Sequence, residues 1–195
     1  MISYSEMAAD YVQNRIIGMS KSNNEPQVRA NLAKLRRGVD KHPGENPEIW
    51  EVTISDIDEK LQSRDGNPTW AEWAIHLALC LFALHQQGKD IKTNCMHKAG
   101  ERLGLAIRKL KSSDSEDTDP VKRRFNVLAT SNDIDEFAHH LRGMVQLLKS
   151  NDIALDYALL TKDIFEFMEP DHRNLLRLRW GQDFYGGVKA EFSEK

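Results

Sequence analysis

The stretch WAEWAIHLALCLFALH, residues 70–85, decides the fold of this chain. Placed on a helix, it is apolar on most sides, which is typical of an element at the centre of a helical core. It is shorter than the ~20 apolar residues that cross a bilayer and it carries Glu72 and His76, so it does not predict a membrane span. Four of its side chains are expected to be buried at the centre of the N-terminal half: Trp70, Trp73, Leu77 and Leu81.

On both sides of this stretch, apolar residues recur with a period near 3.6, and no alternating run is long enough to form a sheet. Helix-start signals are found along the whole chain, at Ser5, Pro26, Thr69, Asp119 with Pro120, Ser131 or Asn132, Asp156 and Pro170. A further helix is expected to place four residues on one face: Ala99, Leu103, Ala106 and Leu110. Residues 40–67 are rich in turn-forming residues and predict only short helical pieces. The predicted fold class is therefore all-α, a helical bundle protein of eight to nine helices in two sub-bundles.

The domain organisation follows from one polar tract. At 195 residues the chain is long enough for one domain or two small ones. The tract SSDSEDTD, residues 112–119, is acidic and has no apolar residue, so it is predicted to be a linker. We expect an N-terminal helical bundle over residues 1–111 and a C-terminal helical bundle over residues 120–187.

Composition excludes several classes of protein. The chain is 29% charged and 40% hydrophobic, as ordinary globular proteins are. Its two cysteines, Cys80 and Cys95, do not form a disulfide framework, and its first residues contain acids where an export signal needs basic residues. A cytoplasmic protein with no membrane partner is expected.

The sequence carries no motif of a known catalytic or metal site. There is no GxSxG, no glycine-rich phosphate loop and no HExxH. His76 and Cys80 share a helix face at i, i+4, but His85 is nine residues further on and no CxxC or HxxxH completes four ligands. The acids at 133–136 lie at a helix start, where the helix dipole stabilises them. We therefore expect no catalytic residue, no metal and no cofactor.

Charge is distributed in blocks along the chain. The formal net charge of -3 disfavours nucleic-acid binding only weakly, because an average hides local patches. Residues 45–60 hold six acids and one lysine, whereas residues 21–41 and 98–111 are strongly basic. Like charges repeated on one helix face repel slightly, which favours a polyanionic ligand. The alternatives are that these cations pair with acids elsewhere in the bundle or are simply solvated. No aromatic strand motif accompanies them, so contacts to the nucleic-acid backbone rather than to base edges are expected.

Several segments, taken in order, resemble one known family. They are RANLAKLRRG at 29–38, RRF at 123–125, DIDEFAHHLRGMVQLLK at 133–149, DHR at 171–173 and RLRWGQDF at 177–184. Together they are similar to the CasB family, the small subunits of the type I-E CRISPR Cascade surveillance complex. The resemblance runs over roughly residues 5–185 and does not extend to residues 40–67 and 87–97.

The resemblance implies an all-helical, two-bundle, non-catalytic protein that is present as two copies in an RNA-guided antiviral complex. The implied partners are crRNA and target DNA, the Cas7-type backbone subunits, the large subunit of Cascade and a second copy of the chain. In such a complex the protein would be a scaffold subunit that contacts strand backbones and stabilises the R-loop. R-loop formation is nearly balanced in base-pairing free energy, so such contacts can shift it.

The residues expected to make these nucleic-acid contacts are Arg29, Arg36, Arg37, Arg123, Arg124, Arg142, Lys149, Arg173 and Arg177. For Arg36 and Arg177 an equal alternative is an internal ion pair that braces the bundle. The alternative for the whole protein is a helical protein–protein adaptor that uses the acidic segment 45–60. The acidic segment is otherwise expected to be a solvated face.

Overall fold

The computed structural model describes residues 3–110 and 120–186, and helices are its regular secondary structure. Within those ranges there is no β-strand, and only an isolated bridge joins His97 and Leu155. This confirms the all-α prediction. The nine α-helices of the described ranges are α1 (Tyr4–Lys21), α2 (Glu25–Arg36), α3 (Trp50–Thr53), α4 (Trp70–Gln86), α5 (Leu103–Arg108), α6 (Pro120–Thr130), α7 (Ile134–Ser150), α8 (Tyr157–Met168) and α9 (Pro170–Gly186). Two short 3-10 helices, η1 (Pro47–Ile49) and η2 (Glu59–Leu61), lie in the turn-rich segment.

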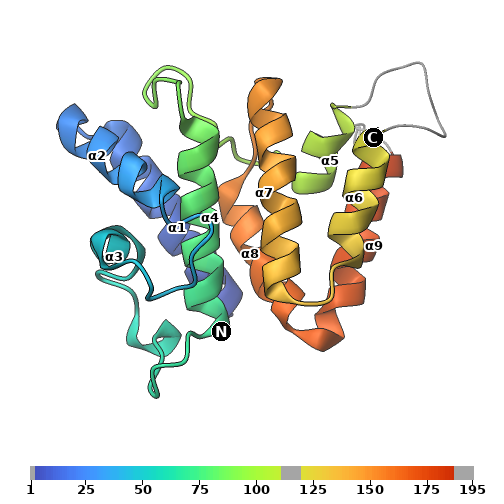
Figure 1. The fold of residues 1–195 in the computed structure, drawn as a ribbon, viewed down its shortest axis with the longest axis horizontal. Coiled ribbons are helices and arrows are strands. Elements are labelled where there is room, and N and C mark those ends of the chain that lie inside the picture. Colours follow the sequence, from blue (N-terminus) through green and yellow to red (C-terminus); the bar gives the residue numbers. More distant parts are fainter. Residues whose placement is uncertain (1–2, 111–119, 187–195) are drawn as a thin grey trace, which may run out of the picture.

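Helix α4 is the central element, as the sequence predicts. It packs against α1 and α2 on one flank and against α7 and α8 on the other (Figure 1). Thr69 begins the helix with a capping box, since its hydroxyl accepts the Glu72 N–H and the Glu72 carboxylate accepts the Thr69 N–H. None of the described helices has the length and apolar character that a bilayer span requires.

The predicted burial along α4 is confirmed for Leu77 and Leu81 and is wrong for Trp70 and Trp73. Trp70 is 43% exposed, because the first turn of α4 lies at the margin of the core. Its ring contacts Phe165 of α8 edge to face, with a centroid distance of 5.8 Å. Trp73 is half-buried. Apolar periodicity identifies the helix but does not show how far its first turn extends beyond its neighbours.

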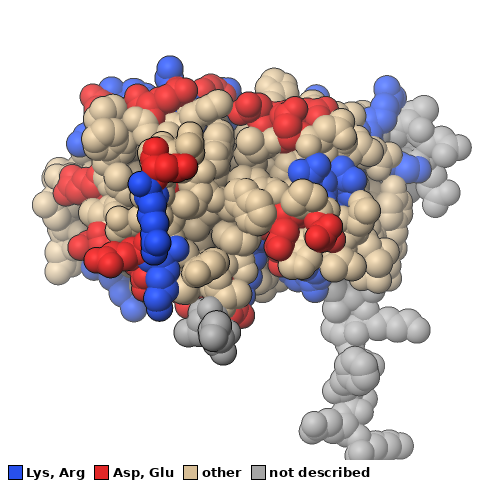
Figure 2. Space-filling view, turned by 90° about the horizontal axis from the view of Figure 1, so that it is seen from below, with Lys and Arg blue, Asp and Glu red and all other residues tan. Residues whose placement is uncertain are grey.

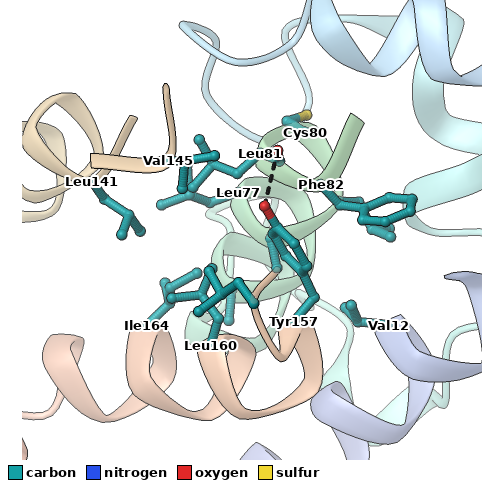
Figure 3. Close-up of a cluster of buried hydrophobic side chains, with 14 of the residues drawn as sticks. Val12, Leu77, Cys80, Leu81, Phe82, Leu141, Val145, Tyr157, Leu160 and Ile164 are labelled. Atoms are coloured by element: carbon teal, nitrogen blue, oxygen red, sulfur yellow. Dashed lines mark hydrogen bonds between the residues drawn. The ribbon is translucent and has the colours of Figure 1, made fainter. Parts of the chain in front are cut away.

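One hydrophobic core combines side chains from before residue 111 and after residue 119. Figure 3 shows Val12 of α1, residues of α4 and α7, and Leu160 of α8 around the buried Tyr157. The Tyr157 hydroxyl lies 3.2 Å from the Leu81 carbonyl oxygen, to which it donates. Helix α8 thus packs directly against α1 and α4. The proposed bundles 1–111 and 120–187 stay a prediction, because the linker 112–119 lies outside the described residues.

Three helix starts differ from the predicted ones. Ser3, not Ser5, caps α1, and Asp133, not Ser131 or Asn132, caps α7. Helix α5 begins only at Leu103, so Ala99 is not on its face. The reason is a turn at Gly100, whose φ is +82° and whose N–H donates to Asp156 at 2.8 Å.

Candidate nucleic-acid interface

Arg173 and Arg177 of α9 direct their donors into the protein. Arg173 donates from Nε to the Phe167 carbonyl and from Nη1 to the Asn132 carbonyl, both at 2.9 Å. Arg177 donates from Nη2 to the Ser131 carbonyl at 2.9 Å. These bonds tie α9 to the turn between α6 and α7. Arg177 thus braces the bundle through a backbone carbonyl, whereas the alternative considered from sequence was an internal ion pair. Each guanidinium has part of its donors bonded within the protein.

Arg36 and Lys149, together with Lys89, form a cluster of positive charge where α2, α4 and α7 meet. We call these three residues the seam cluster. Partial burial lowers the pKa of Lys149, and the charges of Arg36 and Lys89 lower it further. Lys149 donates to the Gln87 side-chain oxygen at 2.9 Å, and Lys89 pairs with Asp152. The fold therefore brings together like charges that are distant in sequence. Sequence analysis missed Lys89, which lies in a stretch outside the resemblance.

Arg142 lies two helical turns before Lys149 on the same face of α7. Its guanidinium pairs with Asp40, just beyond the end of α2. The ion pair spans 102 residues of sequence and joins α7 to the end of the second helix. Arg142 is thus beside the seam cluster but is partly neutralised.

Arg29 lies on α2 and Arg37 directly follows the helix, and both side chains are exposed. The Arg37 guanidinium is 3.3 Å from the Glu48 carboxylate, with both side chains more than half exposed. An exposed pair of this kind contributes at most about 1 kcal/mol. Arg37 therefore faces the acidic segment 45–60 rather than the other predicted cations.

Arg123 and Arg124 line a groove between α6 and α7. The groove has a volume of about 320 Å³ and also holds His139 and His140 of α7. Both arginines are exposed. The two histidines lie beside the arginines because of the way α6 and α7 pair in the fold. The remaining lining residues are Val127, Gly143 and Met144.

The nine predicted cations thus occupy separate places rather than one row. Figure 2 shows the face of the molecule turned downward in Figure 1, where basic and acidic side chains alternate. No continuous basic stripe crosses that face among the described residues. The structure brings together Arg36 with Lys149, and Arg123 with Arg124. Arg29, Arg37 and the α9 pair stand apart from both groups.

The residues weighed as metal ligands have internal partners. His76 Nε2 lies 2.8 Å from the Lys41 carbonyl, and burial lowers the pKa of His76. Burial raises the pKa of the Cys80 thiol well above its usual range. His85 Nδ1 lies 2.9 Å from the Tyr157 hydroxyl, and burial lowers the pKa of His85 to about 4. In residues 3–110 and 120–186, no three His, Cys, Asp or Glu side chains are arranged to hold a metal ion.

A buried acid lies between α8 and α9. The Asp163 carboxylate accepts hydrogen bonds from Trp180 Nε1 and from Arg179, each at 2.7 Å. Arg179 also donates to Glu166 at 2.8 Å. Burial raises the pKa of Asp163 to about 6, although both of its donors oppose the shift. Because every charge here has a neighbouring partner, the network accounts for the docking of α9 on α8.

Comparisons with known proteins agree on one family. The family model described as CRISPR-associated protein Cse2 matches residues 31–185. The crystal structure of CasB from Thermobifida fusca is 30% identical, with a TM-score of 0.74 over 95% of this chain and 99% of that chain. CasB from M. ruber is 24% identical, with a TM-score of 0.60 over 95% and 94% of the two chains.

A third similar structure is a chain of a CRISPR RNA-guided surveillance complex. It is 19% identical, with a TM-score of 0.67 over 94% of each chain. At this identity the likeness concerns the fold alone. A comparison with curated proteins gives no significant match.

Proposed function

Because the chain belongs to the CRISPR-associated Cse2 (CasB) family, we propose that it is a non-catalytic, nucleic-acid-binding scaffold subunit of a type I-E Cascade complex. The observation that carries the proposal is the family match over residues 31–185. The fold shared with a chain of a CRISPR RNA-guided surveillance complex supports it. The proposed partners are crRNA, target DNA, Cas7-type backbone subunits, the large subunit and a second copy of this chain.

The proposed role is to stabilise the R-loop through strand backbones. Exchange of a DNA duplex for an RNA–DNA duplex is nearly balanced in free energy, so a few protein contacts decide its extent. Phosphate contacts by Lys and Arg do not depend on base sequence, which suits a complex whose guide varies. The seam cluster supports this role, because it places Arg36 and Lys149 near each other, and neither forms an ion pair with another described residue, whereas Lys89 is paired with Asp152.

Among the nine predicted cations, Arg36, Arg124 and Lys149 are the first candidates for strand contacts. They lie on rigid helices, and none of them takes part in an ion pair with another described residue. We place Arg173 and Arg177 last, because their guanidinium groups are hydrogen-bonded to backbone carbonyls.

A charge reversal in the assembled complex tests the proposal. Arg36→Glu combined with Lys149→Glu should weaken target DNA binding for every guide sequence. The slope of log affinity against log salt should flatten by about 0.7 for each single-strand phosphate contact that is lost. The matched control reverses Lys21 and Lys60, two exposed lysines away from the seam cluster. Unchanged affinity and slope in an intact complex would refute the role of the seam cluster.

A protein-docking function for the acidic segment is the second candidate. Within it, Trp50 and Ile54 are each 41% exposed and line a groove of about 200 Å³ with Pro43 and Pro68. An apolar groove surrounded by acids suits a basic protein segment with an apolar anchor. Trp50→Ala should then reduce incorporation of the chain into the complex, as measured by size-exclusion chromatography. If incorporation is unaffected, this surface is not an assembly interface.

A further inference from the structure

We propose that the groove between α6 and α7 seats one nucleotide of a single strand, with the phosphate at Arg124 and the base stacked on the His139 ring. The inference rests on the proposed nucleic-acid-binding function and adds a site at which a base is contacted as well as a phosphate. This distinguishes the groove from the seam cluster, which has no aromatic ring among its three members.

The groove has the size and form of a small-ligand site. Its volume of about 320 Å³ falls at the lower end of the range that such sites occupy, which is about 300–1,000 Å³. Its walls come from two helices joined by a short turn, and that turn is held by Arg173 and Arg177 of α9. The turn that joins the two walls is therefore tied to α9.

Arg124 provides the anion-binding group. Its side chain is exposed and lines the groove, and within residues 3–110 and 120–186 it forms no ion pair. A guanidinium offers five donors in a rigid plane, which match the oxygens of a phosphate. Arg124 thus differs from Arg173 and Arg177, which each donate at least one hydrogen bond to a backbone carbonyl.

His139 provides an aromatic face. The ring is exposed, and it meets the His140 ring at a centroid distance of 5.2 Å and an angle of 78°. His140 lies 4.0 Å from Glu136 one turn earlier, which leaves His139 as the outer ring. Imidazole rings are among the side chains on which unpaired bases stack. Stacking uses the face of a base and not its edge, so it tolerates any sequence.

The floor of the groove leaves room for a planar group. A methyl group added at Gly143 would meet no atom within 4 Å, so the helix backbone is open at this point. Val127, on the opposite helix, is 43% exposed and presents an apolar surface. The groove thus combines an apolar wall, an open stretch of backbone and an aromatic ring, which suit a base, with a cation, which suits a phosphate.

The test compares two labelled strands of equal length on the full chain by fluorescence anisotropy. One strand is an oligothymidylate, and the other is an abasic strand with the same number of phosphates. His139→Ala should weaken binding of the oligothymidylate by about fivefold or more and leave the abasic strand unchanged. His139→Phe should retain binding of the oligothymidylate, and Arg124→Glu should weaken the binding of both strands to the same extent. The matched control is His172→Ala, which removes an exposed histidine of α9.

A second variant fills the groove without reducing helix stability. The Cβ of Gly143→Leu meets no atom within 4 Å, and leucine is a better helix former than glycine, so thermal unfolding should show a folded protein. The variant should weaken binding of the oligothymidylate more than binding of the abasic strand.

If His139→Ala reduces the affinity for both strands equally, or for neither strand, the base does not stack on His139. If the free chain binds neither strand at low salt, the groove proposal fails, while the salt series on the assembled complex still decides the proposed function.

Discussion

Two glycines in helices are expected to respond in opposite ways to the same substitution. A methyl group at Gly104 of α5 would lie 2.7 Å from the Trp180 carbonyl oxygen and 2.6 Å from the Asp183 Cβ. At Gly143 of α7 the added methyl group meets nothing within 4 Å. The comparison of Gly104→Ala with Gly143→Ala therefore isolates the close approach of α5 to α9, because both changes add the same group to a helix.

The magnitudes follow from packing and helix propensity. Alanine in place of a helical glycine stabilises by about 1 kcal/mol, which is the expected effect at Gly143. At Gly104 the obstacle is backbone, which cannot rotate aside, and overpacking of this kind destabilises by about 1–3 kcal/mol. Gly104 also lies in the first turn of α5, where helix propensity contributes least. The two variants should differ in free energy of unfolding by roughly 2–4 kcal/mol.

Urea and thermal unfolding measure this difference. At this chain length each kcal/mol corresponds to about 2–4 °C, so Gly104→Ala should melt roughly 4–16 °C below Gly143→Ala. Urea curves with equal slopes would show that the difference lies in stability and not in the unfolded state. If Gly104→Ala is as stable as the unsubstituted protein, the close packing of α5 on α9 is wrong. The position of α9 against the α6–α7 turn would then be wrong as well.

Two further predictions concern the core. Tyr157→Phe should lower the free energy of unfolding by about 1–3 kcal/mol, because the hydroxyl bonds to the Leu81 carbonyl and to His85 Nδ1 inside the core, whereas Tyr4→Phe at an exposed site should change little. The contribution of His85 to stability should also be lost as the pH drops from about 6.5 toward 4, because burial lowers the pKa of His85 to about 4 and this residue then binds more protons in the unfolded chain than in the folded one. The pKa of Asp163 is raised to about 6, so protonation of Asp163 below pH 6 favours the folded state and opposes the effect of His85. Asp163→Asn should therefore steepen the loss of stability at low pH, and His85→Gln should reduce it. Urea unfolding at several pH values measures both changes.

The helices could be predicted from sequence because their signals are local. Periodicity and capping residues identify α4 and α7 to within a residue or two. The start of α5 could not be found in this way, since it is set by Asp156, which accepts the Gly100 N–H from 56 residues away. The exposure of Trp70 likewise depends on where neighbouring helices end, which the sequence of α4 does not contain.

The candidate site was predicted only as a set of residue types. Spacing alone correctly places Arg142 and Lys149 on one face of α7, but it does not reveal Asp40 as the partner of Arg142. The bracing of Arg177 depends on a backbone carbonyl of Ser131, and backbone partners leave no trace in composition. Lys89 became part of the seam cluster only once α4, α2 and α7 were packed together.

Helix α7 links the two candidate contact regions. His139, Arg142, Gln146 and Lys149 follow one another at spacings of three, four and three residues, so they lie along one helix face over about 15 Å. One end of this face borders the α6–α7 groove and the other joins the seam cluster. On the proposed path, a strand bound at His139 would run along this face toward Lys149. Because Asp40 pairs with Arg142 midway along the face, we expect the strand to be bound more tightly at the two ends of α7 than between them.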